Sequence, residues 1–162
     1  MVRTRAVVVA ILAAASLGGW WVGRAARGTT SQSAVVIKAV DGDTIDVQIG
    51  GQVDTVRLLG IDTPETHHPT KPVQCFGPEA AAYTKSRLEG RTVVLEDDVE
   101  PRDLYDRRLA YVYLDGHRFN DELIEKGYAR LLVIPPNGSH SRRMLAEELK
   151  AKRNGVGLWG QC

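Results

Sequence analysis

Cysteine is scarce in this sequence, and neither a low-complexity tract nor an internal repeat is present. The only two cysteines, Cys75 and Cys162, lie far apart and lack the spacing of metal ligands, which argues against a cysteine-based metal site. The ordinary composition, with 43% hydrophobic and 25% charged residues, argues against a disordered or repeat protein. A chain of 162 residues with this composition predicts one globular domain with a genuine core.

A surplus of positive charge is also missing from most of the chain. Arg3, Arg5, Arg24 and Arg27 all precede the first acidic residue, Asp41. Without these four arginines, 17 basic residues stand against 20 acidic ones, a formal charge of −3. This balance excludes a broad basic surface for nucleic acid, so any binding of phosphate must depend on a few placed cations.

The N-terminus has the pattern of a targeting element. Two arginines precede Ala6–Gly23, a run without any charge that ends with Trp20-Trp21 before Arg24. A basic start, an apolar run and interfacial aromatic residues are typical of export signals and membrane anchors. The Ala13–Ala15 sequence resembles a cleavage site but lies inside the run, so both an uncleaved anchor and a cleaved signal remain open. We expect residues 1–27 to be a signal peptide or N-terminal membrane anchor that places the rest outside the cytoplasm.

In an oxidising compartment, Cys75 and Cys162 are the natural partners for a disulfide bond. A bond that closes so long a loop stabilises the fold by up to ~4–5 kcal/mol in the chain-entropy model. Two unrelated thiols are the alternative.

Residues 28–33 read as a short linker, and alternating or β-branched strand patterns begin after it. Asn120 is expected to be an N-cap, because Asp121 and Glu122 follow it in a first helical turn. The expected strands are Ala34–Val40, Thr44–Ile49, Val53–Leu59, Thr92–Glu96 and Leu109–Leu114, with a short continuation at His117–Phe119, and the expected helices are Pro78–Glu89, Asn120–Lys126 and Ser141–Arg153. This order predicts a small, partly closed five-stranded β-barrel with helices packed on it, over residues 34–162.

Two acidic segments flank the first hairpin. Asp41-Gly42-Asp43-Thr44 alone is typical of a turn, and Asp62-Thr63-Pro64-Glu65 alone is typical of a helix N-terminus. Because the strands between them can bring both segments to one end of a barrel, the pair predicts a site for a hard cation such as Ca²⁺. The adjacent His67 and His68 are interpreted as loop residues, since neighbouring side chains point apart in extended chain.

Arg57 and Arg107 are the candidate phosphate ligands, because a guanidinium group matches phosphate oxygens and keeps its charge. Each alone is more typical of a surface salt bridge. Together with the acidic segments, they supply what a phosphodiesterase needs: an oxygen-ligand site for a divalent ion, a carboxylate for a water molecule, and cations for the transition state.

These motifs closely resemble the staphylococcal nuclease (thermonuclease) family. The resemblance runs from about Ala34 to Trp159 and includes DGDT, VRLLGIDTPET, FGPEAAAYTK and YDRRLAYVYLDG. It implies an α+β, mainly β fold, a five-stranded OB-fold barrel with three packed helices. It also implies calcium-dependent hydrolysis of DNA and RNA that leaves 3′-phosphate ends, by a protein expected to be monomeric.

The resemblance also implies roles for the acidic residues. Asp43 and Asp62 match the calcium-binding carboxylates, the backbone carbonyl of Thr63 matches a further ligand, and Asp41 matches an acid close to the ion. Glu65 matches the residue that orients or deprotonates the attacking water.

Three further positions match the family's substrate contacts. Arg57 and Arg107 match the arginines that bind phosphate and stabilise the transition state, and Tyr105 matches a tyrosine beside that phosphate. The chain departs from the family pattern at Leu131–Pro136, where no aromatic residue stands in place of two pocket tyrosines, and at Leu104, which replaces a lysine. Because stacking contributes ~1–3 kcal/mol per base, this departure weakens the expected nucleotide affinity.

Two other interpretations remain open from the sequence. A non-catalytic OB-fold module that binds nucleic acid does not need the acids and both arginines together. A purely structural calcium-binding domain explains the acids but gives Arg57 and Arg107 no role. The expected partners are DNA and RNA as substrates, and a membrane if the N-terminal segment is uncleaved.

Overall fold

The structure, a computed structural model, describes residues 31–66 and 72–162. The expected signal or anchor at 1–27 and the two loop histidines, His67 and His68, lie outside the described residues. Within the described part of the chain, no helix has both the length and the apolar character needed to span a membrane.

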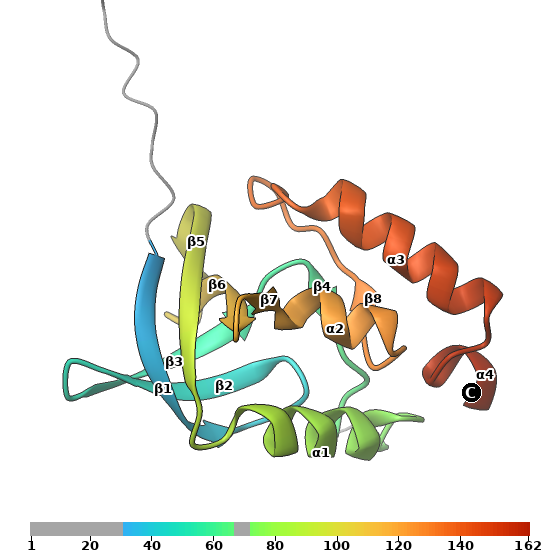
Figure 1. The fold of residues 1–162 in the computed structure, drawn as a ribbon, viewed down its shortest axis with the longest axis horizontal. Helices are drawn as coiled ribbons and strands as arrows, with labels where there is room; N and C mark the ends of the chain where they lie inside the picture. Colours follow the sequence, from blue (N-terminus) through green and yellow to red (C-terminus); the bar gives the residue numbers. More distant parts are fainter. Residues whose placement is uncertain (1–30, 67–71) are drawn as a thin grey trace, which may run out of the picture.

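Five strands close into a barrel, as the sequence predicted (Figure 1). They form the sheet order β3-β2-β1-β5-β6, and a parallel pairing of β3 with β6 closes the ring. The strands are β1 (Ser31–Ala39), β2 (Thr44–Ile49), β3 (Gln52–Leu58), β5 (Thr92–Arg102) and β6 (Arg108–Leu114). Closure removes the open edges that a five-stranded sheet would otherwise present.

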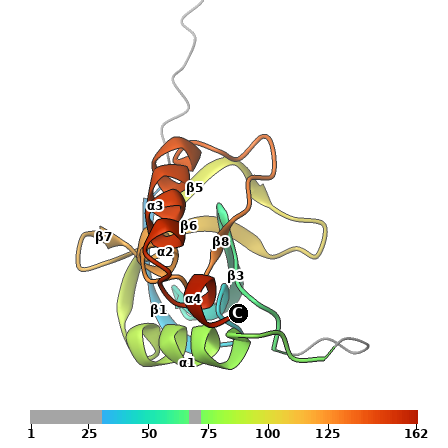
Figure 2. The same ribbon diagram turned by 90° about the vertical axis from the view of Figure 1, so that its right-hand side faces the viewer.

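The three expected helices are present within a residue of their predicted bounds, as α1 (Gly77–Leu88), α2 (Phe119–Glu125) and α3 (Ser141–Arg153). A fourth short helix, α4 (Leu158–Gln161), was not expected. Figures 1 and 2 both place α1 along one end of the barrel, with α3 lying against α2. The prediction that Asn120 caps α2 is wrong, because the helix begins at Phe119 and Arg118 is the N-cap. Asn120 is instead buried, and its side chain joins β6 to the residue after β3, accepting a hydrogen bond from the Val112 N–H and donating one to the Leu59 carbonyl.

Two strand boundaries differ from the expected ones by more than one residue. Ser31–Ser33 belong to β1, where they pair with β5, so the last half of the predicted linker is strand. The strand predicted at Thr92–Glu96 continues to Arg102. Short strands were also missed, because β4 (Ile61–Asp62) and β8 (Arg130–Leu131) are too brief for any periodicity to appear. The third short strand, β7 (His117–Arg118), lies within the expected continuation.

The core fills the barrel and extends under the helices. Alternating residues of the strands point inward, and examples with no exposed surface are Val36, Ile45, Val56 and Leu95. Each fully buried aliphatic side chain stabilises the fold by roughly 1.5–3 kcal/mol. Arg57, between two buried neighbours on β3, points to the other side of the sheet. This rigid barrel is what holds the polar side chains of the site in place.

Candidate active site

The structure brings nearly all the predicted site residues to one cleft of about 620 Å³. The cleft lies where the β1–β2 turn, the end of β3 and the segment after β4 meet. The predicted site residues that line it are Asp41, Asp43, Arg57, Asp62, Thr63, Glu65 and Arg107. Tyr105 does not line this cleft and belongs to a neighbouring pocket that shares both arginines.

Asp43 is the most firmly held carboxylate of the cleft. Its Oδ2 atom accepts hydrogen bonds from the Thr63 N–H at 2.9 Å and the Thr63 hydroxyl at 3.0 Å. Its Oδ1 atom accepts the Thr44 hydroxyl at 3.1 Å. Asp43 and Thr63 are both buried, at 7% exposure each. The carboxylate oxygens are therefore fixed before any ligand arrives.

Gly42 lets the two acidic segments approach each other. A Cβ atom at this position would lie 2.7 Å from the Thr63 hydroxyl oxygen and 2.8 Å from Thr63 Cγ2, closer than side chains can pack. The Gly42 carbonyl also accepts the buried Thr84 hydroxyl of α1 at 2.7 Å. The Asp-Gly pair is thus a turn, as its composition indicates, and it is also the contact that brings Asp43 to Thr63.

Arg57 joins the two expected calcium carboxylates. Its Nη2 atom lies 3.2 Å from Asp43 Oδ2 and 3.1 Å from Asp62 Oδ1. Its Nη1 atom donates to the carbonyls of Leu58 and Ile61, both at 2.9 Å. The side chain is only 15% exposed. Arg57 is therefore a structural connector between β3 and β4 as well as a cation of the cleft.

The cleft concentrates negative charge. Partial burial is the main cause that raises the pKa of Asp41, and the Glu65 and Asp43 carboxylates raise it further against the hydrogen bonds from Gly42 and Thr66. Partial burial and then the charge of Asp43 raise the pKa of Asp62, although Arg57 acts in the opposite direction. Burial is the larger cause of both shifts and the neighbouring carboxylates add to each, so a bound cation would favour the ionised form of these acids.

The donor set fits a hard divalent cation. Carboxylate and backbone carbonyl oxygens are the ligands that Ca²⁺ takes in proteins. Among residues 31–66 and 72–162, no group of three or more His, Cys, Asp or Glu side chains is arranged to hold a metal ion. The expected ligand set has only two such side chains, Asp43 and Asp62, with the Thr63 carbonyl as the third protein ligand. In this structure the Arg57 guanidinium contacts both carboxylates, so it stands beside the position that a cation would take.

Arg107 is held from the β5–β6 connection by one acid. Its Nε atom donates to Asp103 Oδ2 at 2.8 Å, and its Nη2 atom lies 2.7 Å from the same oxygen. The other oxygen, Asp103 Oδ1, accepts the backbone N–H groups of Tyr105 and Arg107. Although partial burial opposes ionisation, these hydrogen bonds lower the pKa of Asp103. The Arg107 guanidinium carbon lies 5.4 Å from the centre of the Tyr105 ring.

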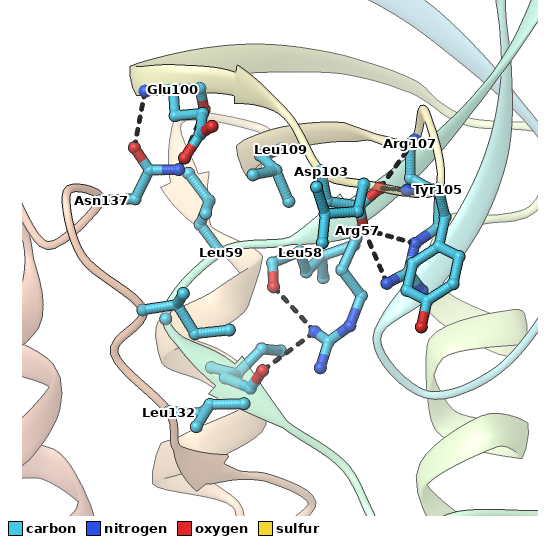
Figure 3. A pocket seen from close by; sticks show the side chains of 14 residues that line it. Arg57, Leu58, Leu59, Glu100, Asp103, Tyr105, Arg107, Leu109, Leu132 and Asn137 are labelled. Atoms are coloured by element: carbon cyan, nitrogen blue, oxygen red, sulfur yellow. Dashed lines mark hydrogen bonds and ion pairs between the residues drawn. The ribbon is translucent and has the colours of Figure 1, made fainter.

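A second hollow, of about 430 Å³, adjoins the acidic cleft (Figure 3). Figure 3 shows Arg57 near its centre, with Arg107 and Tyr105 on one side and Leu132 on the other. The remaining lining is largely apolar and includes Ile134. The segment that lacks the expected tyrosines therefore does line a pocket beside the arginines, with aliphatic side chains in it. Tyr105 is 81% exposed and is the aromatic residue available at its rim.

The structure also contains the expected disulfide between Cys75 and Cys162, with an S–S distance of 2.09 Å. It joins the segment before α1 to the residue after α4. Both half-cystines are exposed.

Sequence reasoning missed three contributors to the cleft. The Thr63 side chain, expected to matter only through its backbone, holds Asp43. Asp103 holds Arg107, and its spacing of four residues from Arg107 is the only signal that the sequence offers. Arg130 lies opposite Asp62 in the β4–β8 pair and opposes the rise in the pKa of Asp62, a contact that no local pattern predicts.

Comparison with known proteins identifies the family to which the chain belongs. The family described as staphylococcal nuclease homologue matches residues 55–161. The thermonuclease of Staphylococcus intermedius is 41% identical over 128 residues, which cover 79% of this chain and 76% of that protein. The thermonuclease of Staphylococcus hyicus is 39% identical over the same shares of the two chains. Endonuclease YncB of Bacillus subtilis is 39% identical over 126 residues, which cover 76% of this chain and 60% of that protein. The family match and these identities establish that the chain belongs to the staphylococcal nuclease family.

Proposed function

We propose that this protein is a calcium-dependent nuclease that hydrolyses phosphodiester bonds of DNA and RNA and leaves 3′-phosphate ends. The observation that carries the proposal is a single cleft that holds four acidic side chains and two arginines. The names of the relatives, thermonuclease and endonuclease, support the same reaction class.

In the proposed mechanism, Arg57 and Arg107 bind the oxygens of the scissile phosphate. Guanidinium groups keep their charge at any working pH and oppose the negative charge that grows on those oxygens in the transition state. Asp103 holds the Arg107 side chain in one orientation, which reduces the entropy lost when phosphate binds.

Glu65 has the role of general base. It accepts a proton from a water molecule, whose oxygen bonds to phosphorus while the bond from phosphorus to the 5′-oxygen breaks, and the departing 5′-oxygen takes a proton from solvent to become a hydroxyl group. General base catalysis contributes typically about 10²–10⁴-fold to a rate. Asp43, Asp62 and the Thr63 carbonyl would hold Ca²⁺, with Asp41 close to it. A bound Ca²⁺ supplies Lewis acidity towards the phosphate.

The apolar pocket beside the arginines is the proposed place for a base or sugar of the substrate. Tyr105 is the aromatic residue at hand to contact the nucleotide, and Leu132 and Ile134 offer only aliphatic contact. We therefore expect weak ground-state affinity and little preference between bases.

The proposed compartment is extracytoplasmic, with the protein either secreted or anchored by its N-terminal segment. The Cys75–Cys162 disulfide supports this, since such bonds persist in oxidising compartments. The charge pattern of the first 27 residues supports it independently.

The experiment is a fluorogenic oligonucleotide assay with DNA and RNA substrates, comparing the wild type with Glu65→Gln. We expect the wild type to cleave both in Ca²⁺ and the variant to lose about 10²–10⁴-fold in kcat. A protein that binds oligonucleotide without cleaving it would instead be a non-catalytic module, and the proposal would be wrong.

A further inference from the structure

Gln74 clamps the backbone of Glu65. The Gln74 N–H donates to the Glu65 carbonyl at 3.0 Å, and the Glu65 N–H donates to Gln74 Oε1 at 3.0 Å. Both backbone polar groups of the proposed base are thus satisfied by one residue nine positions later in the chain. The place from which the Glu65 side chain reaches into the cleft depends on where Gln74 lies.

Gly77 packs against the same piece of backbone. A Cβ atom there would lie 3.0 Å from the carbonyl oxygens of both Pro64 and Glu65. The Gly77 N–H also donates to the Gln74 carbonyl at 3.1 Å. The two chain segments are therefore in direct backbone contact, and a shift of the later segment is transmitted to Glu65 without a flexible side chain between them.

The disulfide fixes this later segment from outside. Cys75 directly follows Gln74, and its sulfur is bonded to Cys162 across a sequence separation of 87 residues. Cys162 follows α4, which is itself attached to the body: Leu158 is buried at 2% exposure, and its N–H donates to the Gly127 carbonyl at 2.9 Å. A covalent connection thus runs from the packed α4 to the residue next to the clamp.

We propose that the Cys75–Cys162 disulfide, acting through Gln74, positions Glu65 for catalysis, so that turnover depends on the redox state of this bond. The inference rests on the proposed function of Glu65 as general base. Cys75 and Cys162 are positioning residues, since neither lines the cleft.

Both sulfurs belong to exposed residues and are open to an external dithiol. In the reduction, a thiolate of the dithiol attacks one sulfur, the S–S bond breaks, and a second thiolate resolves the mixed disulfide. The dithiol loses two electrons and two protons and becomes a cyclic disulfide, while Cys75 and Cys162 become thiols. The two hydrogen bonds between Gln74 and Glu65 remain, but the segment that contains Gln74 and Cys75 is no longer covalently attached to the residue after α4.

We expect reduction of the disulfide to lower kcat and to leave KM nearly unchanged. The phosphate-binding arginines lie on β3 and on the β5–β6 connection, which the bond does not touch. A displacement of a catalytic group by about 1 Å lowers a rate by about 10²-fold. We expect kcat to fall by about ten- to hundredfold when the bond is broken, with KM within about twofold of its original value.

The test uses the full-length protein in Ca²⁺ and measures kcat and KM for a fluorogenic oligonucleotide before and after treatment with dithiothreitol. The Cys75→Ser/Cys162→Ser double variant should show the low kcat in both conditions. Thermal unfolding under each condition fixes an assay temperature at which every form is folded.

Two substitutions of Gln74, which leave the disulfide in place, keep the test independent of the disulfide's effect on folding. Gln74→Ala removes the acceptor for the Glu65 N–H, but the Gln74 N–H can still donate to the Glu65 carbonyl, so we expect only a partial loss of kcat, of about three- to tenfold. Gln74→Glu keeps an acceptor oxygen at that position and should restore most of kcat. A purely structural role of the disulfide would lower the unfolding temperature while leaving kcat of the folded, reduced protein unchanged.

The outcomes separate the two proposals. If Glu65→Gln keeps the wild-type kcat, the proposed function itself is wrong. If Glu65→Gln is inactive while the reduced protein, the double cysteine variant and Gln74→Ala all keep the wild-type kcat, only the positioning role is overturned.

Discussion

Arg57 and Arg107 have equivalent proposed roles towards phosphate but different surroundings, and replacing each by alanine should separate catalysis from stability. Arg57 is 15% exposed and contacts two carboxylates and two backbone carbonyls. Arg107 is 32% exposed, and its side chain pairs with Asp103. The two substitutions therefore remove the same charge from the cleft but very different amounts of internal bonding.

The expected magnitudes follow from these contacts. In Arg57→Ala, the Leu58 and Ile61 carbonyls and the Asp62 carboxylate lose a hydrogen-bond donor, and the buried Asp43 carboxylate loses its ion pair. A buried polar group left unsatisfied destabilises a protein by about 1–3 kcal/mol, and we expect a total of about 2–4 kcal/mol after water enters the gap. In Arg107→Ala, a partly exposed ion pair is lost, which destabilises by less than about 1 kcal/mol.

Urea unfolding and oligonucleotide hydrolysis measure the two effects. Both variants should lose about 10²–10³-fold or more in kcat, the effect of removing one transition-state donor. Arg57→Ala should also lower the urea midpoint by about 1–2 M, given an m value near 2 kcal/mol/M. Arg107→Ala should leave the midpoint nearly unchanged.

Arg91→Ala is the matched control, because Arg91 forms an exposed ion pair with Asp115 and does not line either hollow of the site. It should change neither kcat nor the urea midpoint. The reasoning is refuted if Arg57→Ala and Arg107→Ala unfold at the same urea concentration, or if Arg107→Ala keeps the wild-type kcat.

Three further outcomes are expected. Partial burial opposes ionisation of Asp98, but hydrogen bonds from Ser139 and other donors lower the pKa of Asp98 in the folded state. The stabilising contribution of Asp98 is therefore complete above about pH 4 and is lost as pH falls through the lower folded pKa. In urea unfolding, Asp98→Asn should be less stable than the wild type at pH 7, and the difference should shrink below pH 4. Ile134→Tyr adds a stacking surface to the apolar pocket, where Ile134 is 64% exposed, and should lower KM for an oligonucleotide by at least about fivefold, whereas an unchanged KM would place the substrate elsewhere. Gly42→Ala places a methyl group 2.7 Å from the Thr63 hydroxyl, so it should destabilise the fold by about 1–3 kcal/mol and lower kcat, and full activity would contradict the close contact.

The sequence predicted the fold well where periodicity is long. The five main strands and three main helices have clear alternation, helical composition or turn residues at their ends, and the structure confirms them. The predictions that were wrong or missing concern residues whose local structure depends on tertiary contacts. Asn120 has the composition of an N-cap, yet its amide is used to bridge Val112 and Leu59 inside the protein. The two-residue strands β4 and β8 exist only because Leu131 meets Ile61, a pairing with no local signal.

The candidate site was predicted as a set of residues but not as an arrangement. Arg57 alternates out of phase with the buried Val56 and Leu58, so its side chain leaves the core and turns back along the end of β3 to two carbonyls and two acids. The residue pattern of a single strand cannot predict this path of the Arg57 side chain. Likewise, Gln74 lies outside every predicted motif, and its contact with Glu65 appears only when the chain returns to start α1.

The most direct test of the central claim is the hydrolysis rate of a fluorogenic single-stranded DNA as free Ca²⁺ is raised from zero in a chelator-buffered solution. The account predicts no turnover without Ca²⁺, a saturable rise as the ion is added, and loss of that rise in Asp43→Ala, whose carboxylate the structure holds through Thr63 and Arg57. Full turnover in excess chelator, or a calcium response that survives Asp43→Ala, would contradict it.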